Sequence, residues 1–285
     1  MDAHSAANDG RIFEFSDCRE LTKAISAIVE CPEQAWRIMD HCLLASREPH
    51  GKVLGVTGPE FVGKSTLINA LITAFRRHGY AIAVLAIDPT SHISGGAMLG
   101  DRIRMRDHWL DQGVFIRSIA TRSATGGIAH GLPHILDLMQ RLADVVIVET
   151  AGSGQTDADI AALCHTLLVI PATTGDEISV MKSGAKEYAH VLAVNIREDD
   201  ARAERFAHAL RGEWEGGALP DGWQRKVYAV DALSGKGVDE LVTDGILAHW
   251  IYLEATACAD TATSATSSEQ PVKTDQPNTS KKTNQ

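Results

Sequence analysis

Short apolar runs separated by helix-length segments dominate the middle of the chain. From residue 53 onward the runs VLGVT, IAVLAI, VVIVE, LLVI and VLAVN recur, with segments such as 67–78 between them. Runs that are apolar throughout are typical of parallel strands buried on both faces, and the longer segments supply crossover helices. The pattern predicts an α/β fold in which a mostly parallel sheet is flanked by helices.

Helical patterns lie on both sides of this region. Asp17 and Glu20 resemble a capping pair before an amphipathic stretch, and Pro32 can open a second helix, so residues 17–50 are predicted as a helical arm after a flexible 1–16. Further predictions are helices at 134–142, 176–188, 200–213 and 238–253 and a strand at 226–230. Residues 258–285 lack Leu, Ile and aromatic side chains and are predicted to be disordered, which leaves 51–257 as the core domain.

Composition narrows the class of protein. The net charge of −10 and pI near 5.6 argue against a broad nucleic-acid surface. No apolar run approaches the roughly 20 residues that span a bilayer, and the start MDAHSAANDG lacks a signal pattern, so we expect a cytoplasmic protein without membrane contact. Five cysteines without a CxxC pair indicate thiols rather than a disulfide framework.

The stretch GPEFVGKSTL carries the first chemical signal. Gly58, Gly63, Lys64 and Ser65 match the phosphate-loop pattern G-x-x-x-x-G-K-[ST], between a predicted strand and a predicted helix. Backbone N–H groups and a helix N-terminus surround phosphate oxygens in such a loop, the lysine reaches the terminal phosphates, and the serine ligates Mg²⁺. Thr66 follows as a further nucleotide contact. The motif predicts a P-loop NTPase fold.

Acidic residues occur where a magnesium ion needs oxygen ligands. Asp88 and Glu149 end apolar runs, and Asp101 lies in LGDRIRM. Because ligands bind beyond the carboxyl ends of parallel strands, Asp88 and Glu149 are expected in the crevice of Lys64; ordinary surface carboxylates are the alternative.

The stretch ETAGSGQT is typical of a nucleotide-sensing switch. Gly152 can offer its N–H to a γ-phosphate, whose loss on hydrolysis would release the loop. Ser153 stands where Ras-like enzymes carry the glutamine that orients water, and Gln155 comes two positions later. We therefore expect slow unaided hydrolysis.

Taken together, several segments resemble the MeaB/ArgK family of P-loop GTPases over residues 17–255. The segments are GVTGPEFVGKSTL, VLAIDPTSHISGGAMLGDRIRM, FIRSIATRSATGGIAHG, VIVETAGSGQTD and TTGDEISVMKSGAKEYAHVLAVN. The resemblance implies a GTP-binding and GTP-hydrolysing chaperone that gates cofactor loading, protection or reactivation of an adenosylcobalamin-dependent acyl-CoA mutase. A cobalamin adenosyltransferase is a second candidate partner.

The resemblance also implies roles for individual residues, with Mg²⁺ and GTP or GDP as ligands. The implied magnesium positions are Ser65, Asp88, Asp101 and Glu149, and the catalytic candidates are Lys64, Asp101 and Gln155. Residues 175–186 match a third switch facing the mutase, with a solvated helix start as the alternative. Arg117 and Arg122 are either transition-state arginines or structural ion-pair partners.

The phosphate loop departs from the family pattern at Glu60 and Phe61, where small residues are usual. A carboxylate about 6 Å from a phosphate charge is repelled by about 3 kcal/mol at an effective dielectric near 20, unless it turns outward or is paired. At Phe61 the loop is expected to follow a different local path, because the tightest loop positions favour glycine, whose missing Cβ permits positive φ.

The base-recognition segment is altered too. The usual Asn-Lys-x-Asp becomes NIRED, in which Asn195 is unambiguous and either Glu198 or Asp199 must replace the aspartate. Ser-Ala-Leu becomes DAL, where Ala232 N–H is expected to meet the base beside Leu233. Guanine selectivity is thus predicted to be weakened, and homodimerisation through a C-terminal arm is doubtful because that arm is not recognisable.

Two other functions remain open at this stage. The altered loops would suit a regulatory subunit that binds nucleotide weakly or not at all. A nickel metallochaperone would need clustered ligands, and the candidates are the pairs Cys164–His165 and His41–Cys42. Because neither pair has a second pair near it in the sequence, core packing is the favoured interpretation of both.

Overall fold

The computed structural model describes residues 18–35, 37, 48–89, 106–121, 131–150, 159–171, 188–197, 200–215 and 217–267. The chain divides into two compact units, Met1–Trp250 and Ile251–Gln285. Within the described ranges, no helix combines the length and the apolar content that crossing a bilayer requires.

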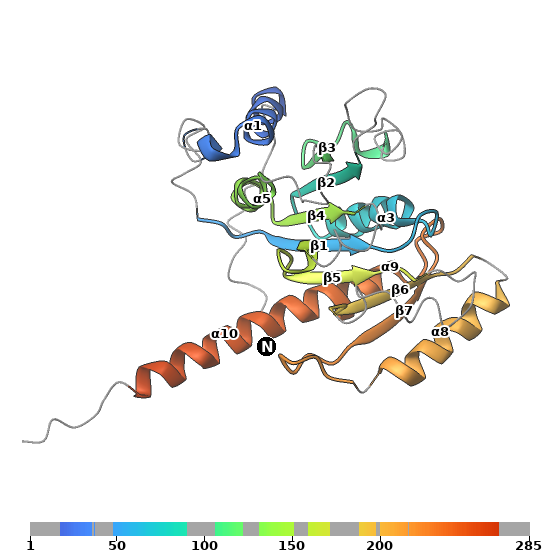
Figure 1. Ribbon diagram of the computed structural model, residues 1–285. Coiled ribbons are helices and arrows are strands. Elements are labelled where there is room, and N and C mark those ends of the chain that lie inside the picture. The colour runs from blue at the N-terminus through green and yellow to red at the C-terminus, as the bar shows by residue number, and fades with distance from the viewer. Residues whose placement is uncertain are drawn as a thin grey trace, which may run out of the picture. The chain divides into compact units, whose positions relative to one another are not determined.

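The described part of the first unit contains a seven-stranded sheet in which every neighbouring pair is parallel (Figure 1). The strand order is β3-β2-β4-β1-β5-β6-β7. The strands are β1 (Lys52–Thr57), β2 (Ile82–Pro89), β3 (Val114–Thr121), β4 (Val145–Glu149), β5 (Thr166–Val169), β6 (Val191–Asn195) and β7 (Lys226–Val230). The predicted α/β architecture is confirmed, and β1 lies at its centre.

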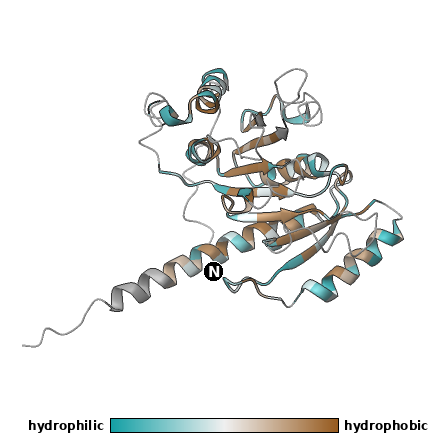
Figure 2. Cartoon of the chain, in the orientation of Figure 1, coloured by the Kyte–Doolittle hydropathy of each residue, from teal (hydrophilic) through white to brown (hydrophobic). Residues whose placement is uncertain are grey.

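Two helical layers bury the sheet. On one face α1 (Cys18–Glu30) and α5 (Leu132–Gln140) pack against the strands of one half, and α8 (Ala201–Trp214) packs against those of the other half. On the opposite face lie α3 (Lys64–Arg77), α9 (Val238–Glu240), the π-helical turn Leu241–Leu247 and the start of α10. Figure 2 shows the strands as mainly hydrophobic, as expected for strands covered on both sides.

The edge strand β3 was not among the predicted strands. Its sequence, VFIRSIAT, is interrupted by Arg117 and Ser118, and β3 pairs with β2 alone among the described strands. The side chain of Arg117 reaches α1, where its Nη2 donates to Ser26 Oγ at 2.9 Å. A polar residue in this strand therefore ties the helical arm to the sheet.

The ends of the chain differ partly from prediction. The first predicted arm helix is α1, but beyond the 3₁₀ turn Pro32–Gln34 most of the second falls outside the described residues. The sequence placed the end of the last helix near residue 253 and disorder from 258, whereas α10 (Ala248–Ser267) continues to Ser267. The reason is that no Pro or Gly interrupts the chain between Gly245 and Pro271, so the helix propagates.

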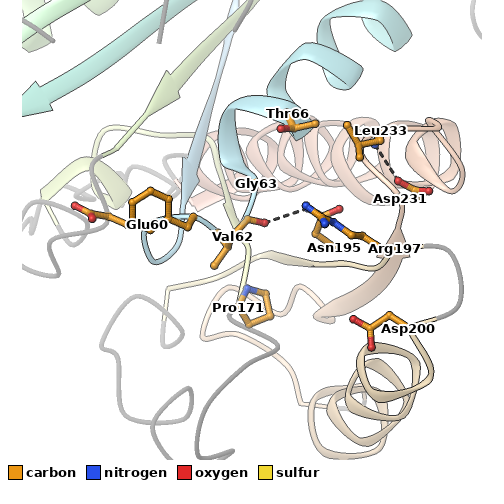
Figure 3. A pocket seen from close by; sticks show the side chains of 11 residues that line it. Glu60, Val62, Gly63, Thr66, Pro171, Asn195, Arg197, Asp200, Asp231 and Leu233 are labelled. Atoms are coloured by element: carbon orange, nitrogen blue, oxygen red, sulfur yellow. Dashed lines mark hydrogen bonds between the residues drawn. The ribbon is translucent and has the colours of Figure 1, made fainter. Parts of the chain in front are cut away.

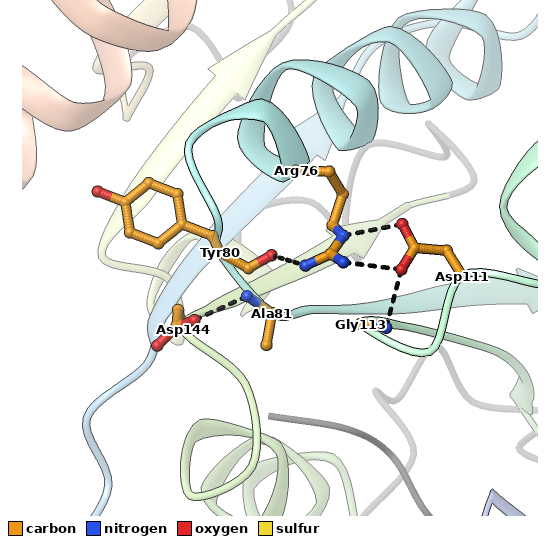
Figure 4. A network of polar contacts seen from close by, with 6 residues as sticks. All are labelled: Arg76, Tyr80, Ala81, Asp111, Gly113 and Asp144. Carbon is orange, nitrogen blue, oxygen red and sulfur yellow. Dashed lines mark hydrogen bonds and ion pairs between the residues drawn. The ribbon is translucent and has the colours of Figure 1, made fainter. Parts of the chain in front are cut away.

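A polar network fixes the C-terminal end of α3, the helix that carries the phosphate loop at its start (Figure 4). Arg76 binds both carboxylate oxygens of Asp111 at 2.8 Å and also donates to Tyr80 O. The hydrogen bond from Arg76 lowers the pKa of Asp111. His108, in the 3₁₀ turn Arg106–His108, lies 3.2 Å from Asn69 O, so α3 is held against the segment that leads into β3.

Candidate functional site

The loop between β1 and α3 has a backbone shape that requires glycine at both ends. Gly58 has φ +150°, and a Cβ there would overlap Ile170 O. Gly63 has φ +93° at the N-cap of α3, and a Cβ there would overlap Asn195 Nδ2. The loop therefore turns tightly into the helix, whose first N–H groups and positive dipole end form an anion site.

Lys64 supplies the positive charge of this loop. Its side chain is nearly buried, with 9% exposed, and Nζ donates to Gly58 O and Pro59 O at 2.9 Å each. A buried ammonium held by carbonyl oxygens can exchange these partners for phosphate oxygens, with which it forms stronger, charge-assisted bonds.

Ser65 and Glu149 are brought together from separate elements. Ser65 Oγ, in the first turn of α3, donates to Glu149 Oε1 at the end of β4 over 2.9 Å, and both residues are 5% exposed. Next to them, Thr150 Oγ1 donates to Thr57 Oγ1 at 2.8 Å. A hydroxyl and a buried carboxylate beside a phosphate site are the oxygen ligands and partners that suit Mg²⁺.

The third predicted magnesium position is described only in its backbone. Asp88 lies on β2, two residues beyond Ala86, which pairs with Glu149 across the β2–β4 ladder. The backbone thus places Asp88 toward the same edge of the sheet as Glu149, while its side chain lies outside the described part of the structure.

Asn195 connects the phosphate loop to the loop after β7. Its Nδ2 donates to Val62 O at 3.0 Å, and its Oδ1 accepts from Ala232 N at 3.2 Å. In this structure Asn195 is thus the acceptor for Ala232 N–H, and the expected contact between this N–H and a base stays a prediction. Asp231 Oδ1 in turn accepts from Leu233 N and Ser234 N.

These loops enclose a pocket of about 320 Å³ (Figure 3). Its lining includes Gly63, Thr66, Pro171, Asn195, Asp231 and Leu233, together with Glu60, Phe61, Val62, Arg197 and Asp200. It runs from the start of α3 to the loop after β7, and its volume lies at the low end of the range for small-molecule sites.

The two unusual loop residues are exposed, although both line part of the pocket. Glu60 is exposed, and in Figure 3 its carboxylate points away from Gly63 and Asn195. Phe61 is 93% exposed and has φ +64°, the left-handed conformation that its position was expected to demand. Phe61 therefore adopts a left-handed backbone conformation that is strained for a residue with a Cβ.

Several predicted residues lie outside the described part of the chain. These are Asp101, Arg122, Gly152, Gln155, Glu198, Asp199, the pair His41–Cys42 and the segment 175–186. Arg117 is described, and its bond to α1 favours its structural role over a transition-state one.

Sequence reasoning missed residues that the fold alone brings to the pocket. Val62 contributes only its carbonyl, and Pro171 follows β5 without any motif. Asp200 carried a signal, because it is the first residue of the helix predicted at 200–213. Its Oδ1 caps α8 by accepting from Arg202 N and Ala203 N.

The described cysteine and histidine clusters do not suit a metal ion. Burial raises the pKa of Cys164 to about 12, which disfavours the thiolate that binds metals, and His165 Nδ1 accepts from Val53 N. His190, Asp221 and His249 place possible ligand atoms within 4.8 Å of one another. However, His190 Nδ1 accepts from Leu167 N, so the proton of the neutral ring is on Nε2, where a metal would have to bind.

Comparisons with known proteins agree with this geometry. The family profile described as "Methylmalonyl Co-A mutase-associated GTPase MeaB" matches residues 19–282. A protein of Pyrococcus abyssi named as a GTPase is 39% identical over 206 residues, or 71% of this chain and 63% of that protein. The GTPase ArgK of Escherichia coli is 34% identical over 200 residues, or 66% of this chain and 58% of ArgK. The chain thus spans less than two thirds of the length of both relatives.

A solved structure described as LAO/AO transport system kinase has a TM-score of 0.62 at 22% identity, covering 83% of this chain and 72% of that one. At this identity the likeness supports the fold alone.

Proposed function

The chain belongs to the MeaB family of GTPases, and from this premise we propose that it is a GTP-dependent chaperone of an adenosylcobalamin-dependent acyl-CoA mutase. In this proposal Mg²⁺ and GTP order the switch segments, the ordered surface docks on the mutase, and contact with the mutase accelerates hydrolysis. The cycle gates loading, protection or reactivation of the mutase cofactor.

One observation supports the proposal most directly. At the start of α3, Lys64 bonds to the loop after β1 and Ser65 bonds to Glu149 on the neighbouring strand β4. The family description names association with methylmalonyl-CoA mutase, which supports the class of partner. The mouse relative named "Methylmalonic aciduria type A homolog, mitochondrial" is 29% identical over 195 residues and points to the same metabolism.

Each described residue has a distinct part in this proposal. Lys64 and the first N–H groups of α3 bind the phosphates, while Asn195 fixes the loop positions on which the base depends. Ser65 and Glu149 fit Mg²⁺ as oxygen ligand and buried acidic partner, and the ion would neutralise charge that develops on the phosphates. Asp88, Asp101 and Gln155 are proposed to complete the magnesium site and to orient the attacking water.

The competing regulatory-subunit function predicts a chain that binds nucleotide weakly or not at all. Three features motivate that alternative: Glu60, Phe61 and the altered NIRED segment. The exposure of Glu60 to water and counterions weakens the first of them. The favoured function therefore includes nucleotide binding.

The test has two stages. Calorimetry of the full chain with GTP, GDP and ATP, with and without Mg²⁺, should show magnesium-dependent binding of guanine nucleotides in the micromolar range. Single-turnover GTP hydrolysis is then measured with and without methylmalonyl-CoA mutase, and the mutase should accelerate it. Binding without acceleration by the mutase would leave a GTPase but refute the chaperone role, and absence of nucleotide binding would refute both.

A further inference from the structure

Three backbone N–H groups follow Asp231 in the loop that closes the pocket, and each is already bonded inside the protein. Ala232 N donates to Asn195 Oδ1 at 3.2 Å. Leu233 N and Ser234 N donate to Asp231 Oδ1 at 2.9 and 3.3 Å. A base that approaches this loop therefore meets donors that are already engaged.

The carboxylate of Asp231 retains capacity to accept a further hydrogen bond. It receives the two N–H groups and a side-chain hydrogen bond from Ser234. A carboxylate offers about four acceptor positions, so about one remains. An aspartate is ionised at neutral pH, and the hydrogen bond from the Ser234 side chain, the main cause of the lowered pKa of Asp231, favours the ionised form further. Asp231 lines the pocket beside Asn195 and Leu233 (Figure 3).

Guanine and adenine differ in what they present to such a loop. Guanine carries the acceptor O6, whereas adenine carries an amino group, a donor, at the same position. An ionised carboxylate beside engaged N–H groups repels an acceptor and attracts a donor. A serine or asparagine at this position would have a hydroxyl or amide hydrogen to donate instead.

We propose that Asp231 sets the base preference of the pocket, weakening the binding of a purine with oxygen at position 6 and admitting one with an amino group there. The ligand class is a purine nucleotide with reduced discrimination between guanine and adenine. This inference rests on the nucleotide binding proposed above and concerns only the base end of the same site.

Asp231→Asn is the sharpest variant. Its side-chain oxygen can still accept from Leu233 N and Ser234 N, so the turn is kept, while its NH₂ group donates toward O6. Calorimetry with GDP and ADP in the presence of Mg²⁺ should show that the GDP-to-ADP affinity ratio rises by about tenfold or more. Asp231→Ser, measured in parallel, should raise the ratio in the same direction and covers the case in which the first variant does not fold.

Asp200→Asn is the matched control. It removes the same charge from the lining of the same pocket, and asparagine caps α8 as well as aspartate does. It should change the affinities for GDP and ADP by the same factor, leaving their ratio unaltered. If the native chain binds GDP and both Asp231 variants leave the ratio within about twofold of the native value, the inference is overturned while the proposed function stands. If the native chain binds neither nucleotide, both fall.

Discussion

At the amino edge of the sheet, Asp144, His165 and His190 each stand directly before a strand, and each accepts a backbone N–H from the neighbouring strand or its approach. The donors are Ala81 N at 2.7 Å, Val53 N at 2.9 Å and Leu167 N at 2.9 Å. At the carboxyl edge, by contrast, Lys64 and Ser65 bond to loop carbonyls and to the Glu149 side chain. Polar side chains thus support strand pairing at one edge and gather around a phosphate loop at the other.

The difference shows how position decides the role of a polar residue in this fold. When a side chain is the acceptor for a buried backbone N–H, its removal leaves that N–H without a hydrogen bond. The loss lowers the unfolding free energy by about 1–3 kcal/mol. A lysine bonded to loop carbonyls can exchange them for a ligand. Changes at the amino edge should therefore alter stability, and changes at the carboxyl edge should alter binding.

The largest effect is expected for Lys64→Ala. Loss of the charged donor to the phosphates should weaken GTP binding by about 10- to 150-fold, because hydrogen bonds to charged groups contribute about 1.5–3 kcal/mol. The thermal midpoint should change little, since the lysine is a ligand rather than a core residue. Calorimetry and thermal unfolding measure the two effects. Lys52→Ala, at the opposite end of β1, should leave GTP affinity unaltered, and retained binding in Lys64→Ala would refute the phosphate-loop assignment.

The next effect concerns stability and the amino edge. His249 is buried between the rings of His190 and Trp223, and its Nδ1 lies 2.8 Å from Thr166 Oγ1. Burial, followed by the charge of His190, lowers the pKa of His249 to about 3, while nearby Asp221 raises it and His165 lowers it further. Because the unfolded pKa is near 6.5, stability is fully present above that pH and is lost as pH falls toward the folded value, at about 1.4 kcal/mol per pH unit.

As the pH falls from 6.5 to 4.5, the low pKa of His249 should therefore reduce the unfolding free energy by roughly 3 kcal/mol. Urea unfolding of the native chain and of His249→Gln across this interval measures its share. Glutamine has no charge to gain, so the variant should show a shallower slope, while His208→Gln on the exposed face of α8 should keep the native slope. Equal slopes in all three proteins would show that His249 is not the group that resists protonation.

Replacing one carboxylate at each edge of the sheet by its amide tests the comparison directly. Glu149→Gln keeps an acceptor for Ser65 Oγ but removes the charge, so the increase in GTP affinity caused by Mg²⁺ should shrink about tenfold. Asp144→Asn weakens the bond to Ala81 N and the contact with His50 Nε2 at 3.6 Å, and should lower the unfolding free energy by about 0.5–1 kcal/mol without changing GTP affinity. Calorimetry with Mg²⁺ or EDTA, together with urea unfolding, separates the outcomes. A change in GTP affinity caused by Asp144→Asn would contradict the assignment of stability to the amino edge and of binding to the carboxyl edge.

The sequence predicted the carboxyl edge better than the amino edge for a physical reason. Phosphate binding needs glycines, a lysine and a hydroxyl at fixed spacing, so Gly58, Gly63 and Ser65 could be found without coordinates. The contacts of His165 and His190 join strands that are distant in sequence, and no local spacing records them. The hydrogen bond from Ala232 N to Asn195 is of the same long-range kind and could not be foreseen. The strand β3 was missed for another reason: an edge strand tolerates polar residues, which hide its periodicity.

The smallest effects are expected at Glu60 and Phe61, the two residues of the carboxyl edge that depart from the family pattern. Because the Glu60 side chain is exposed, Glu60→Gln should change GTP affinity by less than about threefold and should leave its salt dependence unaltered. Phe61→Gly relieves a left-handed φ that costs about 1–2 kcal/mol, partly offset by the greater freedom of glycine in the unfolded chain, so the net stabilisation should be about 0.5–1 kcal/mol. Calorimetry at two salt concentrations and urea unfolding measure these changes. A tenfold, salt-sensitive gain in affinity for Glu60→Gln would mean that the carboxylate faces the phosphates after all, and that binding at this edge is limited by charge rather than by loop shape.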